Sequence, residues 1–114
     1  MNALDVLKDE FIRISEDPPQ SNISVKLVKD NFYEWEIKVV SSSFTHAMLF
    51  DIRFPRDYPD TLPQFKPRRT HSIKGVVYGG PIDGQVLADK VDGDSLSDAI
   101  RGLNVLLLGH EVTE

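Results

Sequence analysis

Few side chains in this chain could do chemistry, and the most reactive type is absent. The 114 residues contain no cysteine, which excludes disulfides, thiolate metal ligands and any reaction that needs a thiol nucleophile. The three histidines, His46, His71 and His110, fall in three separate predicted elements. No His-x-x-x-His pair, Gly-x-Ser-x-Gly turn or glycine-rich phosphate loop accompanies them. The sequence therefore predicts no catalytic residue, no metal site and no cofactor.

Composition and charge are typical of an ordinary globular protein. Hydrophobic residues make up 40% and charged residues 27%, which favours one folded domain over residues 1–114. The net charge of −5 argues against a general nucleic-acid binder. No run approaches the ~20 apolar residues of a membrane span, and the acidic N-terminus is unlike a signal peptide. We expect a cytoplasmic or nuclear protein that contacts neither nucleic acid nor membrane.

Two neighbouring segments carry opposite charge. Residues 64–76 contain four basic residues and no acid, and residues 83–98 contain five aspartates and one lysine. The basic residues are Lys66, Arg68, Arg69 and Lys74. These segments attract one another, face a charged partner, or form solvated surface. The sequence leaves these alternatives open.

Hydrophobic spacing predicts a helix at the start of the chain. Leu4, Leu7, Phe11 and Ile14 follow one another at intervals of three and four, which forms one apolar stripe. Asn2 is placed to cap this helix. Pro18–Pro19 must end it, since proline lacks the amide hydrogen and disfavours helix in the preceding residue.

Alternating hydrophobic residues predict three strands, over 23–27, 33–39 and 50–54. Short connections between them favour an antiparallel meander covered on one face by the first helix. Residues 64–66 are expected to add a short edge strand between prolines. On the inward face Trp35 is either core or a recognition aromatic. Tyr58 is expected to pack, with its hydroxyl as an anchor.

The last third of the chain predicts an irregular segment followed by a helix. Residues 70–93 are rich in glycine and show no period. Helical spacing returns at residues 95–109, with Ser95 and Asp98 placed as a capping box and Gly109 placed to end the helix. The fold class is therefore α+β, with an N-terminal helix on a four-stranded meander, then an irregular segment and a second helix.

Two strings within this pattern resemble the ubiquitin-conjugating enzymes. Residues 30–37 read DNFYEWEI and resemble the family's second strand, and residues 54–63 read FPRDYPDTLP and resemble its proline signature. The string DGQVL at 83–87 resembles the turn and short strand before the active site. The resemblance covers most of the chain and implies the ubiquitin-conjugating-enzyme-like fold. RWD-type domains share the Tyr-Pro region.

Departures from the family pattern point to an inactive member. Counted from Gly84, the position of the catalytic cysteine holds Leu87, whose side chain cannot form a thioester. His71 begins the nearest counterpart of the family's His-Pro-Asn, but no asparagine follows it, and Ser95 stands where a tryptophan is expected. The resemblance also implies that the two C-terminal helices of active members are lacking. Together these departures resemble a ubiquitin-conjugating enzyme variant.

The resemblance implies a partner-binding or ubiquitin-binding subunit in ubiquitin signalling, hetero-oligomeric with an active conjugating enzyme. The surface that such variants use corresponds here to Met1, Asn2, Asp5, Lys8 and Phe44. Phe44 is either an interface anchor or a residue that folds back onto the sheet. The alternative is an RWD-like scaffold, or a peptide-binding adaptor domain, within a larger complex.

Overall fold

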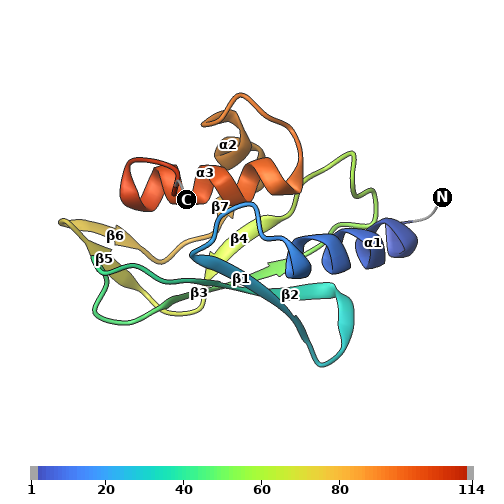
Figure 1. Ribbon diagram of the computed structural model, residues 1–114, viewed down its shortest axis with the longest axis horizontal. Coiled ribbons are helices and arrows are strands. Elements are labelled where there is room, and N and C mark those ends of the chain that lie inside the picture. The colour runs from blue at the N-terminus through green and yellow to red at the C-terminus, as the bar shows by residue number, and fades with distance from the viewer. Residues whose placement is uncertain (1–2, 113–114) are drawn as a thin grey trace.

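The helices lie on one side of a twisted antiparallel sheet, and a small hairpin projects from one end (Figure 1). This computed structural model describes residues 3–112, so the predicted cap Asn2 and the predicted contact Met1 lie outside the described residues. The elements in chain order are α1 (Ala3–Glu16), β1 (Ile23–Val28), β2 (Asn31–Val39), β3 (Met48–Arg53), β4 (Gln64–Pro67), β5 (His71–Ile73), β6 (Val76–Tyr78), β7 (Ile82–Asp83), α2 (Gly84–Asp89) and α3 (Leu96–Leu108).

The first helix forms as its apolar stripe predicts. Leu7 and Ile14 are buried, and Phe11 packs against the same core from a half-buried position. The helix ends at Glu16, and only Asp17 separates it from the pair Pro18–Pro19. One apolar face thus fixes α1 on the sheet, where burial of such side chains contributes about 1.5–3 kcal/mol each.

The main sheet confirms the predicted meander and extends it by one strand. Its strand order is β1-β2-β3-β4-β7, with every neighbouring pair antiparallel. The short strand predicted at 64–66 is present as β4, but it is not an edge strand, because the two residues of β7 pair with Gln64 and Phe65. In the register of β2 with β3, Ile37 pairs with Phe50, and both side chains are buried.

Trp35 belongs to the core, as one of its two interpretations predicted. Its side chain is fully buried, and the indole N–H donates to the carbonyl of Phe32 at 2.7 Å. The ring meets Phe11 edge-on at 5.2 Å between centroids and lies tilted against Phe54 at 4.7 Å. These aromatic contacts join α1 to the inner face of the sheet.

Tyr58 is the packing residue with an anchored hydroxyl that the sequence predicts. Its side chain is buried, and the phenol O–H donates to the Oε2 atom of Glu10 at 2.6 Å. Burial raises the pKa of Tyr58 above its ordinary value, and the hydrogen bond and negative charge of Glu10 raise it further. This hydrogen bond connects the proline-rich crossing, the segment 54–63 between β3 and β4, to α1.

The segment 70–93 is more ordered than the sequence predicts. It holds the two-stranded sheet of β5 and β6, the short strand β7, and the six-residue helix α2. The expected short strand at Val86 and Leu87 is wrong, since both residues lie in α2. Asp83 caps this helix by accepting a hydrogen bond from the amide of Gln85 at 2.9 Å, and a capped start favours helix over strand.

Both predicted ends of the last helix are confirmed. Ser95 is the N-cap of α3, and Ser95 and Asp98 form a complete capping box. Gly109 ends the helix in the left-handed conformation with φ 84°, where glycine bears no steric penalty. A buried face that includes Ile100, Leu103 and Leu107 then packs α3 on the core.

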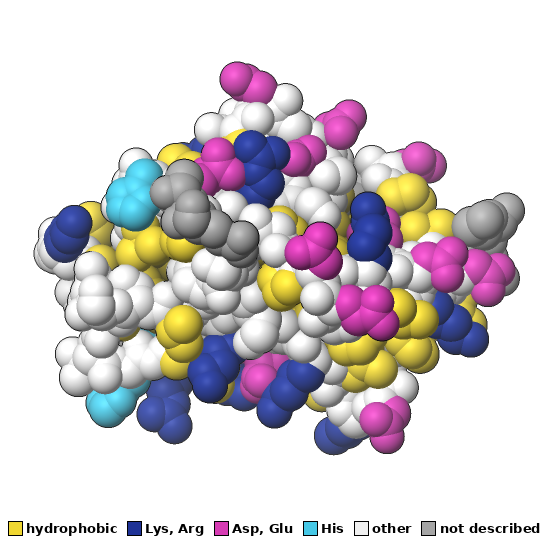
Figure 2. Space-filling view, in the orientation of Figure 1, with side chains coloured by type: hydrophobic (Ala, Val, Ile, Leu, Met, Phe, Trp, Pro, Cys, Tyr) yellow, Lys and Arg dark blue, Asp and Glu magenta, His cyan; other side chains and the backbone are white. Residues whose placement is uncertain are grey.

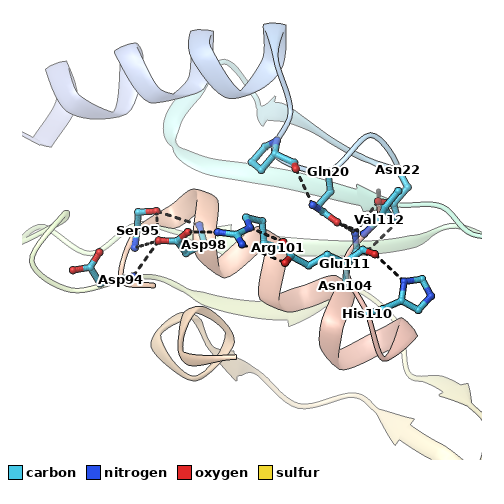
Figure 3. Close-up of polar contacts among 11 residues, drawn as sticks. Gln20, Asn22, Asp94, Ser95, Asp98, Arg101, Asn104, His110, Glu111 and Val112 are labelled. Carbon is cyan, nitrogen blue, oxygen red and sulfur yellow. Dashed lines mark hydrogen bonds and ion pairs between the residues drawn. The ribbon is translucent and has the colours of Figure 1, made fainter. Parts of the chain in front are cut away.

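A buried polar network holds the end of the chain against the start of the sheet (Figure 3). Asn104 of α3 is fully buried, and its Nδ2 donates to Gln20 and to Asn22, both at 2.8 Å. Gln20 Oε1 also accepts the backbone N–H of Val112 at 2.5 Å. Every buried side-chain polar atom of the described residues has a hydrogen-bond partner, so this network is fully satisfied.

Asn104→Leu is expected to lower the free energy of unfolding by about 1–3 kcal/mol, because the variant keeps the volume but leaves the Oδ1 atom of Asn22 without its buried donor. Denaturant titration measures this loss, and faster amide exchange at Val112 locates it. Ser97→Ala on the same helix is the control and should change stability little. Equal stability of wild type and Asn104→Leu would show that the network contributes no net stability.

Candidate functional site

The position counted as the family's catalytic residue lies inside the protein. Leu87 is fully buried in α2, where it packs with Ala88 against α3. A Cβ atom on Gly102 of α3 would lie 1.7 Å from the carbonyl oxygen of Leu87, so the two helix backbones are in direct contact here. A substrate carbonyl has no access to a side chain at this position.

The turn that precedes this position is equally closed. The amide of Gly84 donates to the carbonyl of Pro63 at 3.1 Å. A Cβ atom at Gly84 would lie 2.4 Å from the same oxygen, so only glycine fits. The turn that the resemblance places before an active site therefore joins α2 to the end of the proline-rich segment 54–63.

His71 and Phe44 lie together, away from Leu87. They line one small hollow of about 130 Å³, which also contains His46 and Ile73. Phe44 is half-buried and packs against the core, and its amide donates to Ser41 at 3.1 Å. The structure thus places Phe44 as the alternative interpretation predicted, folded back beside the sheet. The hollow is too small to hold more than a few water molecules.

The predicted partner surface is not continuous in the structure. Asp5 and Lys8 are exposed on α1, with Lys8 Nζ 5.9 Å from the centre of the Phe32 ring. Phe44 lies beside β5, and Figure 1 places the hairpin and the first turns of α1 at opposite ends of the long axis. The structure therefore does not bring Phe44 together with Asp5 and Lys8, and one partner contact of ordinary size would not include all three.

The structure also places the two opposed charge segments. Arg68 pairs with Glu36 and Asp51, and Asp98 pairs with Arg101. Within residues 3–112, Lys66, Arg69 and Lys74 take part in no ion pair. The ion pairs therefore do not join the two segments, and the interpretation of mutual attraction gains no support.

A row of charges on the outer face of the sheet is a feature that the sequence analysis missed. Glu36, buried on that face, accepts from Arg68 at 2.5 Å and pairs with Lys26 at 3.2 Å. Arg68 also donates to Asp51 at 2.5 Å. Figure 2 shows basic and acidic side chains gathered on the lower side of the molecule. The sequence did contain an indication of this row, because Glu36 and Asp51 occupy polar positions in strands where polar and hydrophobic residues alternate.

Hydrogen bonds to Asp51 raise the pKa of Arg68 above its ordinary value. Partial burial opposes this shift, while the hydrogen bond to Glu36 adds to it. Arg68 therefore stays charged at every pH at which the protein is folded. A permanent guanidinium bridging two carboxylates cross-links β2, β3 and the end of β4, which is a structural role.

A broad groove of about 1110 Å³ lies beside this row. It runs over the outer face of β3 and β4 to the prolines of the crossing, and Arg53, Pro63 and Lys66 are among its lining residues. Within the described part of the chain, no three histidine, aspartate or glutamate side chains gather closely enough to hold a metal ion. Among residues 3–112, no helix has the length and hydrophobicity that crossing a bilayer requires.

The comparisons with known proteins agree on the fold. No protein-family model matches the sequence, and no curated protein matches it. Among solved structures, the Plasmodium vivax ubiquitin conjugating enzyme E2 superposes with a TM-score of 0.68 at 19% identity, over 90% of this chain and 98% of that one. The ubiquitin conjugating enzyme E2 from Plasmodium falciparum gives 0.64 at 25% identity, over 93% and 84%. Human ubiquitin-conjugating enzyme E2 G1 gives 0.54 at 19% identity, over 68% and 67%.

The sheet, the helix that precedes it and the helix that closes the core are thus arranged as in these enzymes. The chain departs from them in chemistry, since it holds no thiol. From these observations together, the chain has the fold of the ubiquitin-conjugating enzymes and contains no cysteine.

Proposed function

We propose that this domain is a non-catalytic ubiquitin-conjugating enzyme variant that binds a partner protein or ubiquitin in ubiquitin signalling, in the cytoplasm or the nucleus. One observation carries the proposal: the fold of the conjugating enzymes is kept although the chain has no cysteine to carry ubiquitin. A domain that has this fold but no thiol nucleophile can still bind a partner protein or ubiquitin through its surface. The expected complex is a hetero-oligomer with an active conjugating enzyme.

Burial at the counted active-site position supports the proposal. Leu87 is fully buried and presses against α3. Restoring the thiol alone would place it in the core, where it behaves as a small hydrophobic group. The close packing of α2 on α3, as well as the missing thiol, therefore argues against thioester chemistry at position 87.

Incubation with activating enzyme, ATP and ubiquitin is expected to give no reducible ubiquitin adduct on this chain. The Leu87→Cys variant is expected to stay equally inert, because the new thiol would be buried against α3 and closed off from a substrate. Non-reducing gel electrophoresis measures the adduct, with an active conjugating enzyme as the positive control. A thiol-sensitive adduct on either form would overturn the assignment of a closed site.

A binding experiment tests the proposed role directly. The immobilised domain is offered free ubiquitin and a panel of active conjugating enzymes, each at the same concentration. Retention of ubiquitin or of one conjugating enzyme supports the proposal. Asp5→Lys with Lys8→Glu reverses two of the exposed charges on α1 and is expected to weaken a complex formed through that helix. Retention of none of these proteins would favour the RWD-like scaffold or adaptor alternative.

A further inference from the structure

The hairpin of β5 and β6 is an extension that the main sheet does not need. Its strands pair only with each other, in the register His71↔Tyr78, Ser72↔Val77 and Ile73↔Val76. Lys74 and Gly75 form the two-residue turn, both in left-handed conformations with φ 50° and 82°, as a type I′ turn requires. In Figure 1 the hairpin projects at the end of the long axis away from α1.

The register decides which backbone groups of the hairpin are free. In a hairpin with a two-residue turn, the flanking pair Ile73 and Val76 is hydrogen-bonded, and the next pair, Ser72 and Val77, is not. The N–H and C=O groups of Val77 therefore point away from β5. No hydrogen bond within residues 3–112 uses them. On the opposite edge, Ser72 lines the small hollow that β5 shares with the loop before β3.

The side chains of β6 leave this edge apolar and accessible. Val76 is 51% exposed and Val77 is 66% exposed, on opposite faces of the strand. Folded proteins usually blunt a free strand edge with charges, prolines or a bulge, and β6, which reads VVY, has none of these. An unprotected apolar edge is the feature to which another extended chain can add as a strand.

Charge indicates the character of that added chain. Residues 64–82 contain no acidic residue. Arg69, just before the hairpin, and Lys74, in its turn, make no ion pair within residues 3–112. At the hairpin end Figure 2 shows basic and hydrophobic side chains and no acidic one on the face in view. A segment that carries aspartate or glutamate beside apolar residues is complementary to this surface.

We propose that the free edge of β6 binds an extended acidic and apolar segment of a partner protein by strand addition, with backbone hydrogen bonds to Val77. The segment lies as a third strand beside β6, and its acidic side chains reach Arg69 and Lys74. This interaction goes beyond the proposed function, because it does not require that the partner be ubiquitin or a conjugating enzyme.

Selection from a displayed library of short random peptides tests the proposal. Peptides retained by the full chain are expected to be enriched in aspartate or glutamate and in β-branched residues. The synthesised best peptide is expected to bind at least about tenfold more weakly to Val77→Pro, which removes the outward N–H and leaves the bonds to β5 intact. Val77→Thr keeps that N–H and a similar shape, and is the matched control that should retain binding.

A second variant covers the case in which Val77→Pro disturbs the hairpin. Arg69→Glu with Lys74→Asn reverses one and removes the other of the two positive charges at the hairpin, and asparagine tolerates the left-handed conformation at the turn. Binding is expected to fall by at least about tenfold in this variant and with added salt. Selected peptides without acidic residues, or binding unchanged in both variants, would overturn the proposal. Two further measurements can also overturn the proposal. One is self-association of the chain that is lost in Val77→Pro, and the other is binding to vesicles of phosphatidylcholine and phosphatidylserine without binding to any peptide.

Discussion

Trp35→Ala is expected to lower the free energy of unfolding by about 3–5 kcal/mol, a large share of the ~5–15 kcal/mol that holds a typical domain. The side chain is fully buried between Phe11 and Phe54, so its removal leaves a cavity at the junction of α1 and the sheet. The carbonyl of Phe32 also loses its indole donor. Urea titration measures the loss as a lower midpoint.

Glu34→Ala is the matched control, one residue earlier on β2 and on the other face. Its carboxylate pairs with Arg53 at 2.9 Å, and the side chain of Arg53 is 80% exposed. Exposed ion pairs contribute about 0–1 kcal/mol, so this variant should unfold almost as the wild type does. Equal shifts of the two midpoints would mean that the two faces of β2 have been assigned the wrong way round.

Local patterns made the first half of the fold predictable. The stripe of Leu7 and Ile14 and the alternation around Trp35 each report burial that repeats along one element, and both were confirmed. The capping box at Ser95 is likewise complete within a few residues. Such features are visible in one sequence because the residues that cause them are neighbours.

The segment 70–93 was not predictable in the same way, because its elements are short and depend on distant partners. The strand β7 has two residues and pairs with β4, from which the hairpin of β5 and β6 separates it in sequence. The helix α2 has six residues, fewer than an isolated helix needs, and is held by its contact with α3. One local signal was missed, since Lys74–Gly75 between apolar residues is typical of a hairpin turn.

The candidate site was predictable only in its chemistry. The absence of cysteine excludes the thioester from sequence alone, whereas the burial of Leu87 follows from how α2 packs on α3. Phe44 could not be placed either, because the loop 43–48 is fixed by the distant strand β5. Tertiary packing determines which separate segments form one surface. Assigning surface residues one by one from a resemblance can therefore group residues that lie far apart, as it did for Phe44 and Lys8.

Gly102→Ala is expected to destabilise the domain by about 2 kcal/mol or more, although alanine is the better helix former by about 1 kcal/mol. The new Cβ atom would lie 1.7 Å from the carbonyl oxygen of Leu87 and 2.5 Å from its carbonyl carbon. These are backbone atoms, so no rotation of a side chain relieves the overlap. The helix α2 must move away from α3, which opens the core around Leu87 and Leu103.

Gly80→Ala is the control that separates the packing effect from the effect of lost chain entropy in the unfolded state. No atom lies within 4 Å of a Cβ atom built at Gly80, whose φ is not left-handed. The substitution should therefore be neutral or stabilise by about 0.4–1 kcal/mol, because it restricts the unfolded chain. Thermal and urea unfolding of the two variants measure opposite signs if α2 and α3 are in backbone contact. A Gly102→Ala variant as stable as Gly80→Ala would mean that the two helices are further apart, and that the position of Leu87 is more open than the closed site requires.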